Sequence, residues 1–314
     1  MKRVLITGAS GFVGRHLVPH LHEKKFAIWA TYYRHPRKFP FQVHWLRVDL
    51  TRYQDALEVV RWSRPHYVIH LAAQTRNEES WKRPNYTYEL NVGGTVNLLE
   101  GVARLAPLAR VIIVSSSQVY GTAFSVGRPV TENEAASPLS PYAGSKLLME
   151  MAGLNYFERW GIQVVIARPT NQIGQGQGSS LVFSDFCHQV ALMEMGRKPP
   201  ALQVGDIDIV RDFIHVEDVA RAYWVLATQG KAGEIYNVGR GKGVLLRRAV
   251  DVLKQESRVA FKLNTVDAKM RRNDLRFAVL NGSKLRKLGW RPRTTVWDGL
   301  REVLQEWRQR VREN

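Results

Sequence analysis

The sequence has one cysteine among 314 residues, so no disulfide can form within the chain. This agrees with a reducing compartment, and we interpret Cys187 as a packing residue. No apolar run approaches the roughly 20 residues that a membrane span requires. The first ten residues, MKRVLITGAS, turn polar too early for a signal peptide. We therefore expect a cytoplasmic protein with no membrane partner.

Acidic residues are few, because 28 Asp and Glu stand against 46 Lys and Arg and leave a formal net charge of +18. Such a charge suits nucleic acid, an anionic membrane surface or a phosphate-rich small substrate. The basic residues are scattered, and neither a basic helix nor an alternation of aromatic and basic residues accompanies them. We interpret most of them as a solvated surface and expect no nucleic-acid partner. Zinc-ligand spacing is also lacking, so no metal is predicted.

Strand-like and helical patterns alternate through the first half of the chain. Short apolar runs at 2–7, 26–33, 42–50, 67–74, 111–115 and 163–169 read as strands, and most are separated by amphipathic helical segments. Ser140 and Pro141 are typical of a helix cap and first helical position, and predict a helix that ends near residue 160. This alternation predicts a parallel sheet with right-handed crossovers. After the glycine-rich stretch 171–180 the order is less regular, which indicates a second, smaller region.

Three glycines lie between the first strand and the first helix. The sequence TGASGFVG places them at Gly8, Gly11 and Gly14, and Phe12 and Val13 open the helix. A turn without side chains lets the backbone approach a pyrophosphate, and the helix N-terminus offers N–H donors and a partial positive charge. We therefore predict that this turn binds a dinucleotide cofactor.

The second strand ends without a carboxylate. Its end reads TYYRHPRK and brings Arg34, Arg37 and Lys38 within reach of the adenosine ribose. Basic residues here favour NADP(H), whereas an acidic residue favours NAD(H). The alternative is that these are surface charges, which leaves NAD(H) open. Asp49 and Leu50, at the end of the third strand, are expected beside the adenine.

The strand at 111–115 runs into three serines, and a tyrosine and a lysine follow at helical spacing. Tyr142 and Lys146 are four residues apart, so they share one helix face near the carboxyl edge of the sheet. An ammonium beside a phenol stabilises the phenolate and lowers its pKa toward neutrality. We interpret the two as the acid/base pair of a hydride-transfer enzyme. The sequence lacks the G-x-S-x-G elbow of many hydrolases.

Several motifs together resemble the extended short-chain dehydrogenase/reductase family that acts on nucleotide sugars. They are TGASGFVG, HLAAQT, SSSQVYG, SPYAGSK, RPTNQIGQGQG and RDFIHVEDVARAYW, and they cover almost the whole chain. The resemblance implies an α/β fold, in which a Rossmann-type doubly wound parallel sheet carries a smaller C-terminal α/β substrate domain. We expect the cofactor domain at 1–170, with a segment near 213–240 returning to it, and the substrate domain mainly at 171–314.

The resemblance also implies roles for individual residues. The catalytic hydroxyl of the family stands four residues before the tyrosine of the VYG motif, which gives Ser116, with Ser117 as the neighbouring alternative. Tyr142 would transfer the proton, and Lys146 would hold the nicotinamide ribose. Further cofactor contacts are implied at Leu71, Ala72 and Ala73. Weaker candidates, equally well explained as structural, are His70, Asn91 and Arg168.

By the same resemblance, Gln118 occupies the position at which the 4,6-dehydratases of this family have a glutamate. That glutamate removes the proton beside the keto group, and an amide cannot take up a proton near neutral pH. Dehydration is therefore disfavoured and hydride chemistry remains, with Ser117 and Gln118 beside the sugar.

The later motifs resemble the GDP-sugar branch, especially reductases of GDP-4-keto-6-deoxy-mannose. By this resemblance the nucleotide-diphosphate sugar would be bound by Asn171, Arg211, Tyr236, Asn237, Arg271 and Asp274. Arginine forks suit phosphate better than lysine does. Arg272, Arg276 and Gln175 replace expected prolines, which puts the base in question but not the diphosphate.

The predicted function is an NADP-dependent reduction of GDP-4-keto-6-deoxy-D-mannose to GDP-D-rhamnose. An epimerase that retains NAD is the alternative, because it uses the same catalytic residues. A regulatory protein that only senses the cofactor would have no need of Ser116, Tyr142 and Lys146 together. The family resemblance also implies a homodimer formed by the helices near 93–105 and 141–160, with an apolar face or ordinary core at Leu148, Met149, Met151 and Tyr156.

Overall fold

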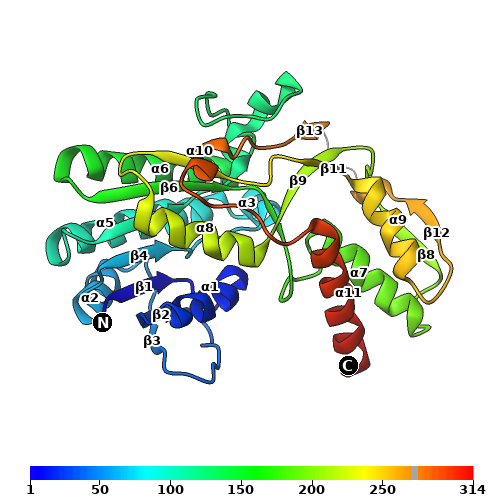
Figure 1. The fold of residues 1–314 in the computed structure, drawn as a ribbon, viewed down its shortest axis with the longest axis horizontal. Helices are drawn as coiled ribbons and strands as arrows, with labels where there is room; N and C mark the ends of the chain where they lie inside the picture. The colour runs from blue at the N-terminus through cyan, green and yellow to red at the C-terminus, as the bar shows by residue number, and fades with distance from the viewer. Residues whose placement is uncertain (270–274, 314) are drawn as a thin grey trace.

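The computed structural model describes residues 1–269 and 275–313. It contains a large parallel sheet at one end of the molecule and a group of later segments beside it (Figure 1).

Seven strands form the large sheet in the order β10-β6-β5-β4-β1-β2-β3, and every neighbouring pair is parallel. The strands are β1 Arg3–Thr7, β2 Ala27–Tyr32, β3 His44–Arg47, β4 Tyr67–His70, β5 Arg110–Val114, β6 Gln163–Pro169 and β10 Ile235–Val238. The chain starts in the middle, builds outward to β3, and then returns to build the other half from β4. The predicted α/β fold with a doubly wound parallel sheet is confirmed.

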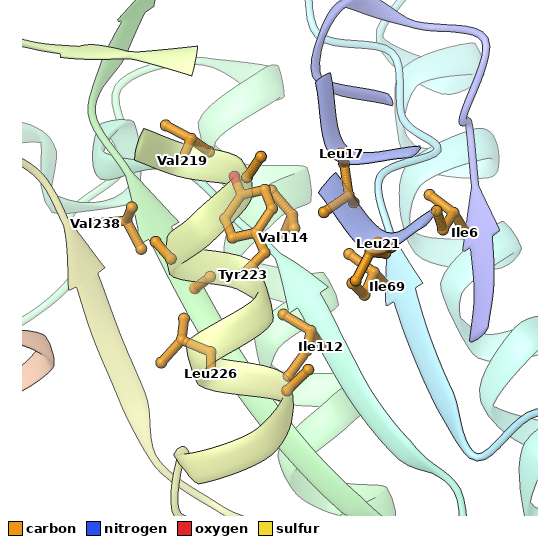
Figure 2. Close-up of a cluster of buried hydrophobic side chains, with 14 of the residues drawn as sticks. Ile6, Leu17, Leu21, Ile69, Ile112, Val114, Val219, Tyr223, Leu226 and Val238 are labelled. Atoms are coloured by element: carbon orange, nitrogen blue, oxygen red, sulfur yellow. The ribbon is translucent and has the colours of Figure 1, made fainter. Parts of the chain in front are cut away.

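Helices cover both faces of this sheet because successive residues of its buried strands point to opposite sides. On one face, strand residues Ile6, Ile69 and Ile112 share one buried cluster with Leu17 and Leu21 of α1 (Phe12–Glu23) and with Tyr223 and Leu226 of α8 (Val216–Gln229) (Figure 2). The other face packs against α2 (Tyr53–Ser63), α5 (Gly94–Leu105) and α6 (Pro141–Trp160). Each fully buried leucine or isoleucine contributes about 1.5–3 kcal/mol.

The α6 helix starts as predicted. Ser140 caps it by accepting a hydrogen bond from the Ala143 N–H at 3.1 Å, and Pro141 takes the first helical position. The segment before α5 was not predicted: it holds α3 (Asn77–Lys82), α4 (Pro84–Tyr88) and a π-helical turn at Glu89–Gly93. A 3₁₀ segment, Ser117–Val126, follows β5.

The later segments enclose a second apolar core. The strands β7 (Asn171–Ile173), β9 (Val210–His215), β11 (Gly243–Leu245) and β13 (Phe277–Ala278) form one small sheet, and β8 (Ala201–Val204) pairs with β12 (Lys262–Thr265). Helices α7 (Val182–Glu194), α9 (Leu246–Glu256) and α11 (Val296–Glu313) pack over them (Figure 1). Cys187 is fully buried in this core, and burial raises the pKa of its thiol, so its predicted packing role is confirmed. The short elements α10 (Ser283–Lys287) and a 3₁₀ turn at Asp267–Lys269 complete the assignment.

None of the helices in the described ranges is long and apolar enough to cross a membrane.

Candidate active site

The glycine-rich turn lies at the carboxyl end of β1, directly against the segment after β4. Gly8 has a φ of +66°, and a Cβ added there would approach the Ala72 Cα to 2.7 Å. A Cβ on Gly14 would overlap the carbonyl oxygen of Ala9. Gly11 closes the turn by donating its N–H to the Gly8 carbonyl at 3.0 Å. Only glycine allows this packing of turn against strand and helix.

The N-terminus of α1 faces this turn with its first N–H groups available. Gly11 is the N-cap, and no side-chain hydrogen bond caps the helix there. Phe12 and Val13, its first two residues, are only half-buried. An uncapped helix start beside a close glycine turn fits the diphosphate of a dinucleotide, because its free N–H groups and dipole favour an anion. The residues present therefore fit NAD(P).

Among the basic residues after β2, Arg37 is the one that reaches the turn. Its Nε donates to the carbonyl oxygen of Ser10 at 2.8 Å, whereas Arg34 is exposed. Burial lowers the pKa of Arg37, and the positive charges of Arg15 and Arg310 lower it further. Glu306 pairs with both Arg15 and Arg310, at 3.3 and 2.6 Å, so the three guanidinium groups leave a net positive charge of about two beside the turn, where the ribose phosphate of NADP would bind.

The other predicted cofactor residues line the neighbouring strand ends. Asp49 accepts hydrogen bonds from the N–H and hydroxyl of Thr51, at 3.1 and 2.7 Å, and so closes the turn after β3. The adjacent Leu50 is buried. Ala72 donates its N–H to the Thr7 hydroxyl at 3.3 Å, which holds the segment Leu71–Ala73 over the end of β1.

Ser116, Tyr142 and Lys146 come together at the carboxyl edge of β5. They are 7%, 7% and 2% exposed, and the Ser116 hydroxyl lies close enough to the Tyr142 phenol to favour its anionic form. The Lys146 ammonium donates to the carbonyl oxygen of Val114, the last residue of β5, at 2.7 Å. The sheet edge and one helix face thus bring the three predicted catalytic side chains into one buried cluster.

Burial shifts both titratable groups of this cluster toward their uncharged forms. It raises the pKa of Tyr142, while the nearby Ser116 hydroxyl acts in the opposite direction. It lowers the pKa of Lys146 to about 7, although the negative charge of Glu150 partly offsets it. The prediction of a lowered phenol pKa is therefore wrong for the chain alone. Desolvation of the buried phenol is the larger effect, and it disfavours the charged phenolate.

A buried polar network lies beneath the cluster, and the sequence reasoning missed its centre, Glu150. Ser115 donates its hydroxyl to Glu150, and Arg168 forms a two-pronged ion pair with the same carboxylate at 2.9 and 2.6 Å. Arg168 also lies 4.6 Å from the ring centroid of Tyr120, whose hydroxyl donates to Asn237 at 2.8 Å. The available signal was the spacing, because Glu150 is four residues after Lys146 on the same helix.

Two weaker candidates are buried and fully engaged in the structure. The ring of His70 lies between the hydroxyls of Thr7 and Thr95, at 2.7 and 2.9 Å, and burial lowers its pKa to about 3. Asn91, inside the π-helical turn, exchanges hydrogen bonds with the backbone of Gln74. Both hold the strand and helix ends around the site in place.

Gln118 is exposed at the mouth of the site, and its N–H donates to the Ser116 hydroxyl oxygen at 3.2 Å. Ser117, beside it, is 9% exposed. Two carboxylates of the neighbouring described segments are engaged elsewhere: Glu150 pairs with Arg168, and Glu132 accepts from the Asn237 N–H at 2.8 Å. Neither is placed to replace a glutamate at position 118.

The predicted substrate residues fall into different environments. Asn171 is exposed, and its side-chain amide donates to the Asp212 carbonyl at 3.0 Å. Arg211, on β9, is half-buried, with one guanidinium N–H bonded to the Val210 carbonyl at 2.8 Å. Both belong to the small sheet in which β7 pairs with β9, beside the carboxyl end of β6.

Tyr236 and Asn237, by contrast, are buried in β10. The Tyr236 hydroxyl accepts from the Lys231 N–H at 3.0 Å, on the side of the sheet away from its carboxyl edge. Asn237 donates to the carbonyls of Val130 and Asn281 at 3.0 and 3.2 Å, which ties the loop after β5 to the sheet. This geometry favours packing and loop-holding roles for the two. Arg271 and Asp274 lie outside the described residues.

Comparisons with known proteins agree with this geometry. Residues 5–303 match the family described as GDP-mannose 4,6 dehydratase. The chain is 36% identical over 313 residues to GDP-6-deoxy-D-mannose reductase from Pseudomonas aeruginosa, which covers 99% of each chain.

Solved structures give the same picture. The structure of RMD from Pseudomonas aeruginosa complexed with NADPH superposes with a TM-score of 0.86 and 33% identity, and covers 99% of this chain and 100% of that one. UDP-glucose 4-epimerase from Thermus thermophilus, in complex with NAD, gives a TM-score of 0.87 and 30% identity, with 98% and 99% covered. The fold therefore accommodates either nicotinamide cofactor.

Proposed function

Because this chain belongs to the GDP-mannose 4,6-dehydratase family, we propose that it is an NADP-dependent reductase that converts GDP-4-keto-6-deoxy-D-mannose to GDP-D-rhamnose. The observation that carries this proposal is the buried Ser116–Tyr142 pair with an amide, Gln118, beside it in place of a carboxylate. Position 118 thus offers an amide where a base for the carbon next to the keto group would stand, while Tyr142 offers an acid for the sugar oxygen.

The chain's residues would divide the work as follows. When bound, NADPH supplies the hydride for the keto carbon. Tyr142 donates its proton to the keto oxygen as negative charge develops there, and Ser116 holds the phenol toward that oxygen. Lys146, anchored on the Val114 carbonyl, would bind the nicotinamide ribose and fix the ring beside the phenol.

The preference for NADPH follows from the charges at the adenosine end. Arg37 lies on the turn itself, and Arg15 and Arg310, which share the carboxylate of Glu306, add net positive charge around it. A phosphate on the adenosine ribose would neutralise part of this charge, whereas the ribose hydroxyl of NAD would not.

The sugar nucleotide would bind between the carboxyl edge of the large sheet and the small sheet. Asn171 and Arg211 lie there, and we assign the diphosphate to them together with Arg271. Ser117 and Gln118 would contact the sugar ring from the other side.

The deciding experiment incubates the pure protein with NADPH and a panel of 4-keto-6-deoxy nucleotide sugars, while the nicotinamide absorbance is followed. We expect stoichiometric oxidation of NADPH with the GDP-linked keto sugar and a GDP-6-deoxyhexose as product. Tightly bound NAD after purification, with interconversion of ordinary nucleotide hexoses and no net turnover of cofactor, would establish the epimerase instead.

We further propose a cytoplasmic homodimer. Tyr88, Val96, Leu148 and Met151 are exposed apolar side chains on α4, α5 and α6, and these helices pack against one another. Met149 is fully buried in the core, and the Tyr156 hydroxyl bonds to Glu100 at 2.9 Å, so the proposed contact depends on the four exposed residues. Exposed apolar groups gathered on adjoining helices are typical of protein interfaces.

A further inference from the structure

The ion pair between Glu150 and Arg168 lies directly beneath the catalytic cluster and is almost completely buried. Its side chains are 2% and 4% exposed, and two hydrogen bonds of 2.9 and 2.6 Å join them. Burying both charges costs roughly as much free energy as their attraction returns, so such a pair contributes little net stability. Its position therefore calls for an explanation other than the strength of the fold.

Glu150 touches both structural elements that carry the catalytic groups. On α6 it lies one helical turn after Lys146 and two turns after Tyr142. Across the sheet edge it accepts the hydroxyl of Ser115, the residue immediately before Ser116. One carboxylate thus links the helix face that bears the acid and the ammonium to the strand end that bears the hydroxyl.

The charges around Lys146 make Glu150 the dominant anion. The titratable side chains around Lys146 at this edge include His70 on β4, Tyr120 in the 3₁₀ segment, Tyr142 and Glu150 on α6, Arg168 on β6 and Tyr223 on α8, whose pKa burial also raises. His70 and the tyrosines are neutral at pH 7, since burial lowers the pKa of the imidazole and raises those of the phenols. Glu150 is the group that raises the pKa of Lys146 against the effect of burial.

We propose that Glu150 is a positioning residue: through Ser115 its carboxylate holds the strand end that carries Ser116 in register with the helix face of Lys146, and its charge increases the fraction of Lys146 that is protonated when NADP(H) binds. The proposal rests on the proposed function only in that Lys146 binds the nicotinamide ribose. It also assigns a task to the serine run after β5: Ser115 anchors the strand end on Glu150, and Ser116 faces the phenol.

The test measures NADP⁺ affinity against pH in the Glu150→Gln variant, by quenching of the fluorescence of the nine tryptophans. The amide keeps the size of the side chain and removes its charge. At a pH above the pKa of Lys146, a fall of about one unit in that pKa reduces the protonated fraction of the lysine about tenfold. We expect the variant to bind NADP⁺ roughly tenfold more weakly than the unmodified protein at about pH 8, and within about twofold at about pH 5.5.

A matched control exists in the second core. Glu194 and Arg308 form another buried pair, 4% and 8% exposed, with the same two-pronged geometry at 2.8 and 2.7 Å. Glu194→Gln should lower the melting temperature as Glu150→Gln does but leave the pH profile of NADP⁺ binding unchanged. A weakening in Glu150→Gln that is equal at every pH would show a merely structural role and overturn the proposal, as would an unchanged profile.

Should Glu150→Gln fail to fold, Arg168→Lys and Glu150→Asp give a second test. Both keep a carboxylate beneath Lys146, so we expect lower melting temperatures with the unmodified pH profile. A shifted profile in both variants would contradict the proposal. Because no sugar is present, these measurements stand whichever keto sugar the enzyme reduces. A protein inactive toward the whole sugar panel, yet with the shifted profile in Glu150→Gln, would refute the proposed function alone.

Discussion

Replacing Tyr142 by phenylalanine is the most direct test of the catalytic cluster. The phenyl ring fills the same buried space at the end of β5, and the change removes one hydroxyl, which lies beside Ser116 and makes at most one neutral hydrogen bond there. Folding and chemistry depend on that hydroxyl to different extents, so their losses can be measured separately.

The expected loss of folding free energy is smaller than the expected rise in activation free energy. Loss of one neutral hydrogen bond costs about 0.5–1.5 kcal/mol of folding free energy. Loss of a general acid lowers the rate about 10²–10⁴-fold, which corresponds to about 2.7–5.5 kcal/mol of activation free energy. The variant should therefore fold and bind NADP⁺ nearly as well as the unmodified protein, while its single-turnover rate of NADPH oxidation with the keto sugar falls by at least a hundredfold.

Tyr156→Phe is the matched control, because it removes a hydroxyl from the same helix. That hydroxyl donates to Glu100 at 2.9 Å and lies far along α6 from the catalytic edge. We expect a comparable change in melting temperature and an unchanged rate. If Tyr142→Phe retained more than about a tenth of the single-turnover rate, Tyr142 could not be the principal acid and the proposed mechanism would be refuted.

Three further outcomes are expected. Arg37→Ala should raise the KM for NADPH about tenfold and leave the KM for NADH nearly unchanged, since it removes the charge-assisted contact proposed for the ribose phosphate. The exposed Arg34 serves as the control, because Arg34→Ala should change either KM much less in steady-state kinetics with the two cofactors. Gly14→Ala should abolish NADP⁺ binding in fluorescence titrations, because its methyl group would overlap the Ala9 carbonyl and displace the turn from the helix. Met151→Glu should shift the protein from dimer to monomer in light scattering, because it places a charge on the apolar face, and a monomeric unmodified protein would contradict the dimer itself.

The architecture of the first half of the chain was predictable because its signals are local. Strands buried on both faces read as continuous apolar runs, and amphipathic helices separate most of them. Ser140 and Pro141 predicted the start of α6 to the residue. The small sheet escaped prediction, since β7, β11 and β13 have only two or three residues and pair with segments distant in sequence.

At the site, spacing predicted which residues meet but not which partners they find. The four-residue spacing of Tyr142 and Lys146 was sufficient to place both at one edge. In contrast, Arg34 and Arg37 are equivalent in the sequence, and only the path of the loop after β2 brings Arg37 to Ser10. Asn237 matched a family motif, yet its side-chain amide donates hydrogen bonds to the carbonyls of Val130, in the loop after β5, and of Asn281.

The direction of the pKa shift at Tyr142 bears on the choice between reductase and epimerase. Adding hydride to a ketone creates an alkoxide, a stronger base than a phenolate, so a reductase needs a phenol that keeps its proton until that moment. An epimerase must first take a proton from a sugar hydroxyl, which requires the phenolate at the outset. Burial raises the pKa of Tyr142 and leaves Lys146 only about half charged near pH 7, so the chain starts with its phenol protonated. The protonated phenol of the chain alone is the form that the reduction uses, whereas an epimerase with these residues would need its bound cofactor to lower the pKa of Tyr142 before the first proton transfer.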